Sequence, residues 1–333
     1  MNYPIRTIKG HGLMLIVLDG LGDQPIKELG WKTPLEAAKT PVMDQMVKEG
    51  QCGLHYPVAP GIAPESTLAH LQLFNYGLEE KNERGVIEVL GTGAEVGQHD
   101  FCYRVNFAYV DRKDKLTVMD RRAHRDEFGL SEMAQGLEKV LNKNPLKLKI
   151  SFKKTLGHRG VLVIKNYRKK TKLGNTDPSV EGLKVTLGDK VTKWLHETSF
   201  KYLSKHKLNL EREAQGLVPA NAILLRGGGK LKLPKETFKQ RNGLNGYAIA
   251  GYPTYLGIAK FCGMDTENVQ DEVVRIPKAI NKLNTSNDFA FVHFKRTDEA
   301  AHDGNFRKKI QAIETYDKLL KPLLKSGFTI AIT

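Results

Sequence analysis

Three segments of the chain carry side chains that could bind a divalent cation or attack a phosphate. Asp298 and His302 are four residues apart, so on a helical turn a carboxylate and an imidazole face the same way and can share one cation. Asp19 directly follows a run of six apolar residues, Leu13–Leu18, and Ser66 stands where a proline-rich loop turns into a helix. These residue types suit phosphoryl transfer, in which a metal-activated serine hydroxyl attacks phosphorus.

Each of these features also has an ordinary structural explanation. An Asp-Gly pair such as Asp19-Gly20 is common in turns, and a serine such as Ser66 is a frequent helix N-cap. A pair such as Asp298 and His302 also occurs on plain helix surfaces. Taken one at a time, the motifs leave both interpretations open.

The surrounding pattern is that of a parallel sheet with helices. The apolar runs at 13–18, 222–225 and 288–294 are typical of strands that are buried on both faces. Shorter strands are predicted at 247–251 and 328–332, and helices at 255–263 and 307–324. Ligands of such sheets bind at the carboxyl ends of the strands, which is where Asp19 and the 298/302 pair would lie.

The middle of the chain has a different pattern. Period-two alternation at 101–111 and 116–120, with further strands at 148–153 and 160–165, indicates antiparallel pairing. We therefore predict an α/β fold with a mostly parallel sheet flanked by helices, formed by 1–100 and 222–333. A smaller inserted α+β domain is predicted at 101–221.

Composition narrows the class of protein. The net charge is +15, and no Asp or Glu occurs from Lys139 to Lys172. This run lacks the interleaved aromatics of a nucleic-acid stacking platform, so a solvated basic face is preferred and nucleic acid is the last choice of partner. No apolar run is long enough to span a bilayer, residues 1–12 show no signal-peptide pattern, and the three cysteines are scattered. We expect a cytoplasmic protein.

Taken together, the motifs identify a family. The chain resembles the archaeal-type 2,3-bisphosphoglycerate-independent phosphoglycerate mutases of the alkaline phosphatase superfamily. The matching segments occur in the family's order over nearly the whole chain: Leu18-Asp-Gly-Leu-Gly-Asp23, Lys32 to Asp44, Ala59-Pro-Gly61 with Ser66 and Ala69-His-Leu71, Arg84-Gly85, Asp120-Arg-Arg-Ala123, His158-Arg159, Thr176-Asp-Pro178, Arg226-Gly227, Ala250-Gly-Tyr-Pro253 and Asp298 to Gly304.

The resemblance implies an alkaline phosphatase-like core and the interconversion of 3-phosphoglycerate and 2-phosphoglycerate through a phosphoserine at Ser66. It also implies two divalent metal ions, Mn²⁺ or Mg²⁺, with Asp19 and Ser66 on one and Asp298 and His302 on the other. The expected partner is a small phosphorylated anion, which arginine forks suit. The residues that would bind it are, by the same resemblance, Arg121, Arg122, His158, Arg159, Asp177 and Arg226.

Three positions depart from the family's pattern. The family has an Asp-His metal-binding pair just after the strand predicted at 328–332, and this sequence stops at Thr333. Leu256 stands where the family has a lysine, and Thr67 where it has an aspartate after the nucleophile. Loss of a ligand or supporting group typically costs about 10–100-fold. Two alternatives are therefore a catalytically impaired homologue that binds an anionic metabolite or partner, and another metal-dependent phosphoryl-transfer enzyme such as a phosphomonoesterase.

Overall fold

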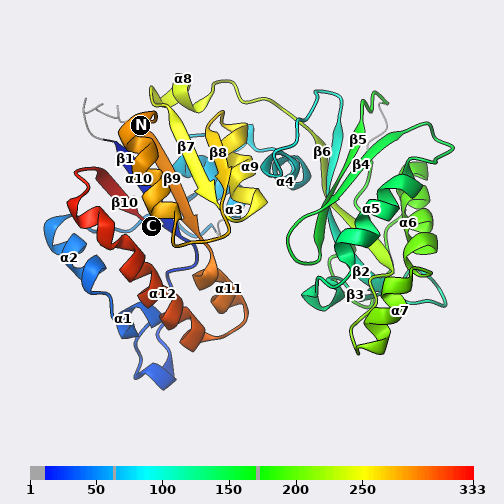
Figure 1. Cartoon of the computed structure of the whole chain (residues 1–333), viewed down its shortest axis with the longest axis horizontal. Helices are drawn as coiled ribbons and strands as arrows, with labels where there is room; N and C mark the ends of the chain where they lie inside the picture. The colour runs from blue at the N-terminus through cyan, green and yellow to red at the C-terminus, as the bar shows by residue number, and fades with distance from the viewer. Residues whose placement is uncertain (1–11, 63–64, 170–172) are drawn as a thin grey trace. The chain divides into compact units, whose positions relative to one another are not determined.

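The computed structural model describes residues 12–62, 65–169 and 173–333 (Figure 1). The chain forms two compact units, called here the core unit, up to Leu78 together with Pro234–Thr333, and the inserted unit, Glu79–Leu233. The signal-peptide prediction for residues 1–12 and the last part of the basic run, 170–172, fall almost wholly outside the described residues. Among the helices of the described ranges, none is long and apolar enough to cross a membrane.

A parallel sheet organises the core unit, with its strands in the order β10-β1-β9-β7-β8 (Figure 1). β1 and β9 pair in register from Leu13 with Phe289 to Leu18 with Phe294. Almost every side chain of these two central strands is buried, as their mainly apolar sequences predict for strands covered on both faces. The strands are β1 (Leu13–Leu18), β7 (Gly246–Ala250), β8 (Asp265–Asn268), β9 (Phe289–Phe294) and β10 (Thr329–Ile332).

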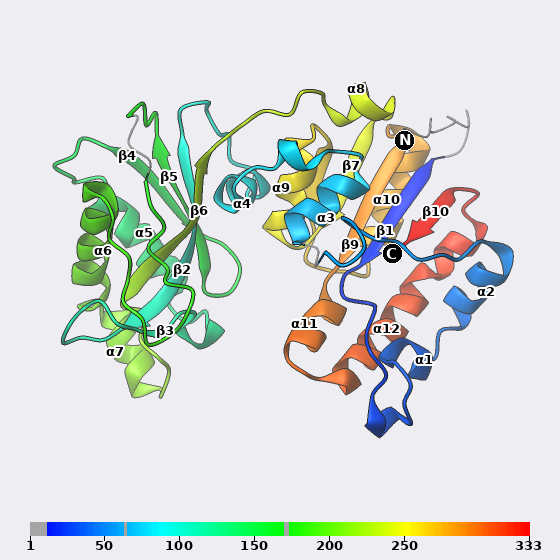
Figure 2. The same cartoon turned by 180° about the vertical axis from the view of Figure 1, so that it is seen from behind.

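Different helices cover the two faces of this sheet. α10 and α12 pack against the face that carries Val292 and Phe294. α3 and α9 cover the opposite face, where Phe74 of α3 meets the ring of Phe291 at a centroid distance of 5.0 Å (Figure 2). The helices are η1 (Lys27–Leu29), α1 (Pro34–Ala37), α2 (Pro41–Glu49), α3 (Ser66–Leu73), α8 (Phe238–Asn242), α9 (Pro253–Phe261), α10 (Arg275–Thr285), α11 (Arg296–His302), α12 (Phe306–Leu320) and η4 (Lys321–Lys325).

The inserted unit is built on an antiparallel sheet, with strands in the order β3-β2-β5-β4 and with β6 also paired to β2. α5 and α6 bury their apolar faces against this sheet. Its strands are β2 (Phe101–Val110), β3 (Val118–Asp120), β4 (Lys149–Lys154), β5 (Arg159–Lys165) and β6 (Ala222–Lys230). Its helices are η2 (Leu78–Glu80), which begins at the unit boundary, α4 (Arg84–Gly91), η3 (Ala123–Arg125), α5 (Leu130–Leu141), α6 (Lys190–Leu203) and α7 (Lys207–Ala214).

The predicted fold class is confirmed: a parallel sheet flanked by helices is accompanied by a second, antiparallel sheet. The placement of 222–225 in the parallel sheet is wrong, because this segment is the start of β6 and pairs antiparallel with β2. Its side chains are buried on both faces, Ile223 in one apolar cluster and Leu224 in another. Its run of apolar residues is therefore the same as that of a buried strand in a parallel sheet. The predicted domain division, 1–100 with 222–333 and 101–221, stays a prediction.

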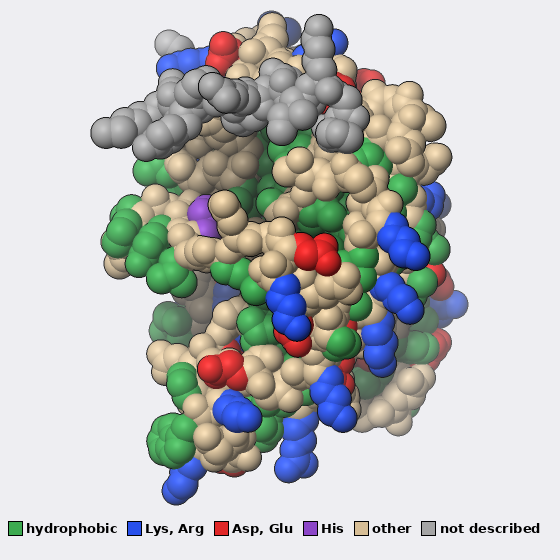
Figure 3. All heavy atoms as spheres, turned by 90° about the vertical axis from the view of Figure 1, so that its left-hand side faces the viewer, with side chains coloured by type: hydrophobic (Ala, Val, Ile, Leu, Met, Phe, Trp, Pro, Cys, Tyr) green, Lys and Arg blue, Asp and Glu red, His purple; other side chains and the backbone are tan. Residues whose placement is uncertain are grey.

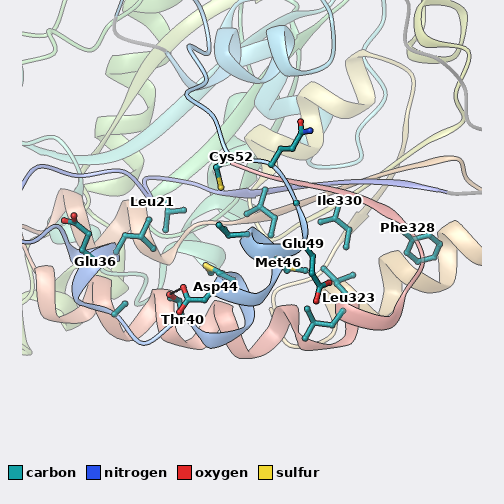
Figure 4. A pocket seen from close by; sticks show the side chains of 18 of the residues that line it. Leu21, Glu36, Thr40, Asp44, Met46, Glu49, Cys52, Leu323, Phe328 and Ile330 are labelled. Atoms are coloured by element: carbon teal, nitrogen blue, oxygen red, sulfur yellow. Dashed lines mark hydrogen bonds between the residues drawn. The ribbon is translucent and has the colours of Figure 1, made fainter.

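A groove of about 820 Å³, lined by both apolar and polar side chains, runs along the edge strand β10, beside α2 and η4 (Figure 4). Figure 3 views the molecule from the side on which α2 lies in Figure 1, and hydrophobic side chains are exposed there among basic ones. Met46, Phe328 and Ile330 are among the groove's lining residues. The lining includes no predicted site residue, so the groove is separate from the candidate chemistry.

Gly85 provides a test of how tightly α4 packs on the antiparallel sheet. A Cβ added there would lie 2.5 Å from the carbonyl oxygen of Gly227 and 2.8 Å from that of Cys102. Gly85→Ala is expected to lower the free energy of unfolding of the inserted unit by about 1–3 kcal/mol, because backbone must move. Urea denaturation measures it. Gly188→Ala, in open space, is the control, and equal midpoints for both variants would contradict the packing.

Candidate functional site

Asp19 lies at the carboxyl end of β1, as the sequence predicts. Its backbone N–H donates to the carbonyl of Phe294 at 3.0 Å, which ties it to the end of β9. Its carboxylate Oδ2 accepts a hydrogen bond from the Tyr255 hydroxyl at 2.6 Å and forms an ion pair with Lys295. His293 Nε2 lies 3.4 Å from the same oxygen. One carboxylate oxygen therefore gathers a phenol, an ammonium and an imidazole.

Asp298 lies beside Asp19 because the two backbone segments touch. Gly20 has a φ of +74°, and a Cβ added to it would lie 2.7 Å from Asp298 Cα. Lys295 Nζ contacts Asp298 Oδ2 at 2.7 Å, so one ammonium joins both carboxylates. His302 Nε2 is 3.6 Å from Asp298 Oδ1, and its side chain is 75% exposed. The structure thus brings Asp19, Asp298 and His302 together.

Ser66 is the first residue of α3, and the N-cap is Glu65, whose carboxylate accepts from the N–H of Thr67 at 3.4 Å. The alternative of an N-cap serine is therefore wrong. The carbonyl of Ser66 lies 2.7 Å from His70 Nδ1, and the His70 ring is 5.4 Å from that of His293, centroid to centroid. The helix that begins at Ser66 thus packs against a residue that contacts Asp19.

The electrostatics of this cluster favour a charged Asp19 and neutral imidazoles. Burial alone would raise the pKa of Asp19, but hydrogen bonding and charge from His293 and Lys295 outweigh it and hold that pKa well below its usual range. Burial lowers the pKa of His293 to about 3 and also lowers the pKa of His70. Lys295 is therefore the positive charge next to Asp19 at neutral pH.

The side chains gathered here are of the types that bind hard divalent cations. Two carboxylates converge on a point that already holds a positive charge, and an imidazole lies next to one of them. Oxygen donors of this kind suit Mg²⁺ and Mn²⁺. Within residues 12–62, 65–169 and 173–333, no three His, Cys, Asp or Glu side chains are arranged around one point. In this structure the Lys295 ammonium pairs with both carboxylates.

The inserted unit holds the predicted substrate-binding residues. Asp177 accepts two hydrogen bonds from Arg121, from Nε and Nη2, each at 2.9 Å, and pairs with Arg226 Nε at 3.1 Å. Arg122 lines a hollow of about 520 Å³ together with Arg121 and Arg125. Two guanidinium groups fixed by one buried carboxylate are preorganised to bind an anion.

His158 and Arg159 lie at the start of β5 in the same unit. The carbonyl of His158 accepts from the N–H of Phe107 at 2.8 Å. Burial, followed by the charges of Arg159, Arg104 and other arginines, lowers the pKa of His158 to about 3. Its neutral ring is therefore surrounded by positive charge.

Sequence reasoning missed several members of both clusters. Tyr255, His293 and Lys295 contact Asp19, and Arg104 is a buried arginine paired with Glu88 at 3.2 Å. Lys295 had a usable signal, because it directly follows an apolar strand as Asp19 does. The others lie within apolar or alternating segments and have no local signal. Thr67 and Leu256, which depart from the family's pattern, are buried in α3 and α9.

Comparison with known proteins shows the family to which the chain belongs. A sequence profile described as the Metalloenzyme superfamily matches residues 11–333. Two 2,3-bisphosphoglycerate-independent phosphoglycerate mutases are each 36% identical: that of Methanopyrus kandleri, over 95% of this chain and 79% of its own length, and that of Pyrococcus furiosus, over 92% and 78%.

Two solved structures are also similar. A protein from Pyrococcus horikoshii superposes with a TM-score of 0.79 at 28% identity, covering 97% of this chain and 81% of its own. The cofactor-independent phosphoglycerate mutase of Thermoplasma acidophilum superposes with a TM-score of 0.64 at 30% identity, covering 97% and 86%. The fold is thus that of a metalloenzyme of the alkaline phosphatase type. Within that superfamily, the chain belongs to the 2,3-bisphosphoglycerate-independent phosphoglycerate mutases.

The low pKa of His158 predicts a pH dependence of stability. The native pKa is about 3 and the ordinary value is 6.5, so the unfolded state binds a proton that the native state excludes. The neutral His158 ring therefore leaves the free energy of unfolding at its full value above pH 6.5. That free energy falls as the pH drops below 6.5, by about 2 kcal/mol at pH 5. His158→Gln should remove that part of the loss, as urea denaturation at pH 8 and pH 5 would show. A variant that loses as much stability as wild type would contradict a neutral buried ring.

Proposed function

We propose that this chain is an isomerase that interconverts 3-phosphoglycerate and 2-phosphoglycerate without 2,3-bisphosphoglycerate, through a phosphoserine at Ser66 and with two divalent ions, Mn²⁺ or Mg²⁺. Membership of the mutase family supports the reaction. The observation that supports the site is that the Asp19 and Asp298 carboxylates both pair with one ammonium, that of Lys295, at the carboxyl edge of the sheet. The relatives favour this function over the impaired homologue and the phosphomonoesterase. A cytoplasmic location, as predicted from the sequence, is part of the proposal.

The proposed chemistry divides between the residues as follows. When bound, the divalent ions would lower the pKa of the serine hydroxyl and neutralise charge on the phosphate. Asp19 and Ser66 would hold one ion, and Asp298 and His302 the other. Ser66 Oγ would form a bond to phosphorus as the bond to the glycerate 3-oxygen breaks, with the serine proton passing to that oxygen. The 2-hydroxyl would then attack the phosphoserine, the Ser66 Oγ–phosphorus bond would break, and the proton of the 2-hydroxyl would return to Ser66 Oγ. The positive end of the α3 helix dipole would favour the phosphate anion.

The arginine cluster would hold the glycerate while the phosphoryl group is on the enzyme. Arg121 and Arg226 share Asp177, which fixes their orientation before substrate arrives. Arg122, His158 and Arg159 would add positive charge and one neutral imidazole. A fixed fork matches a planar carboxylate or a phosphate, which phosphoglycerate supplies together.

Ser66→Ala tests the nucleophile. Removal of the hydroxyl should lower kcat for 2-phosphoglycerate formation by about 10⁴-fold, because no phosphoserine can form. Formation of 2-phosphoglycerate from 3-phosphoglycerate with Mn²⁺ would be followed by a coupled assay, with free phosphate measured in parallel. Ser131→Ala, on the exposed surface of α5, is the control. Full activity of Ser66→Ala would refute the proposed nucleophile, and net phosphate release by wild type would point to a phosphomonoesterase.

Asp177→Asn tests the arginine fork. The amide keeps the size of the carboxylate but loses its charge, so Arg121 and Arg226 are no longer held by charge-assisted bonds. KM for 3-phosphoglycerate should rise by about 10-fold or more, from the cost of such bonds, with a smaller change in kcat. Glu213→Gln breaks the surface pair with Arg112, 2.7 Å long, and serves as control. Equal KM values for the two variants would argue against a binding role for this cluster.

A further inference from the structure

The inference concerns Lys295, the single residue between β9 and α11 and the N-cap of α11. Its Nζ forms ion pairs with Asp19 Oδ2 and, at 2.7 Å, with Asp298 Oδ2. The side chain is 16% exposed, and those of its two partners are 21% and 22% exposed. The ammonium is therefore largely withdrawn from water and shared by the two carboxylates that are proposed to bind metal.

Backbone contacts force these two carboxylates together. Gly20 leaves no room for a Cβ against Asp298, and the hydroxyl of Thr297 donates to the carbonyl of Asp19 at 2.5 Å. The loops after β1 and β9 are thus held together independently of the side-chain charges. The two carboxylates, both paired with one ammonium, repel each other unless a cation lies between them.

The surroundings keep the Lys295 ammonium at that point. It lies 5.4 Å from the centroid of the Tyr255 ring, a distance that suits a cation–π contact. Tyr255 in turn stacks on His293 at 3.4 Å and donates its hydroxyl to Asp19. The neighbouring cation, Arg296, is paired with Glu272 at 2.8 Å. Lys295 therefore supplies the charge that the two carboxylates share.

We propose that Lys295 is an internal cation that competes with divalent metal for Asp19 and Asp298, and so sets the metal concentration at which the site fills. The inference rests on the proposed function only in taking these carboxylates as metal ligands. Each of the two proposed ions needs one of the carboxylates that the ammonium holds, one ion Asp19 and the other Asp298. Metal therefore enters only as the ammonium leaves, and the flexible four-carbon stem of lysine permits that movement.

Metal titration of Lys295→Met tests the competition. Wild type and variant are stripped with a chelator, and Mn²⁺ binding is measured by calorimetry without substrate. The Kd for Mn²⁺ should fall by about 10-fold or more in Lys295→Met, on the scale at which groups around a metal tune its affinity. Lys295→Arg keeps the charge and should retain the weak wild-type affinity. Lys278→Met breaks a remote pair with Glu267 and is the control.

A second measurement uses the unmodified chain and does not depend on how the variant folds. Acetic anhydride labels exposed lysine ammonium groups after deprotonation, and mass spectrometry reports each site. Addition of Mn²⁺ should increase labelling of Lys295 several-fold relative to Lys278, because the displaced side chain reaches solvent. Unchanged labelling of Lys295 at saturating Mn²⁺ would overturn the proposal, as would an unchanged or higher Kd in folded Lys295→Met.

These results separate the inference from the proposed function. Turnover of phosphoglycerate by wild type, with equal metal affinity in Lys295→Met, would refute the competition and leave the mutase proposal standing. Tighter Mn²⁺ binding in the variant, with no turnover by wild type, would support the competition and refute the mutase proposal.

Discussion

The parallel pairing of β1 with β9 determines where the charged groups of the core unit lie. Leu18 is in register with Phe294, so the next residues on the two strands, Asp19 and Lys295, leave the sheet side by side. The ladder continues one step further, since the N–H of Asp19 donates to the carbonyl of Phe294. The register of two buried strands cannot slip without exposing their apolar side chains. The packing of the core therefore also fixes the positions of the site residues that follow these strands.

The two faces of the same sheet have different chemistry. One face is an apolar layer under α10 and α12, with side chains such as Ile16 and Tyr316 fully buried. The other face carries Phe291 and His293 of β9, and the His70 ring of α3 packs against both. Burial of two histidines lowers the pKa of each and keeps them neutral, which costs stability at acid pH. These buried rings pack next to Asp19, with His293 in contact with its carboxylate and His70 packed against His293.

In the inserted unit the charged groups form a cluster with more arginines than carboxylates. Its cluster gathers several arginines, and Asp177 and Glu88 are the carboxylates that hold them in place. Burial, with a smaller effect of the neighbouring arginines, lowers the pKa of Arg104 to about 9, although the charge of Glu88 acts to raise it. A surplus of fixed positive charge is stabilised by an anion, which agrees with a phosphorylated substrate. This arginine cluster is one local source of the chain's net charge of +15.

Much of the fold could be predicted from local pattern. Alternation at 101–111 placed β2, although β2 is buried on both faces. Apolar runs of six and four residues placed β1 and β9, because strands buried on both faces are apolar throughout. The same logic misassigned the segment at 222–225, because a strand covered on both faces in an antiparallel sheet leaves an identical trace. Family motifs supplied the candidate residues; of these, periodicity and spacing predicted Asp19, Ser66, Asp298 and His302.

What the sequence by itself determined was the set of reactive side chains and the strands and helices that carry them, since both follow from residue type and spacing. Only the tertiary structure decided which of those side chains share a charge. The contact of Gly20 with Asp298, the Lys295 ammonium between two carboxylates, and the Asp177 fork join residues dozens to hundreds of positions apart. Electrostatic interaction depends on distance and burial in three dimensions, and neither is encoded in the spacing of residues along the chain.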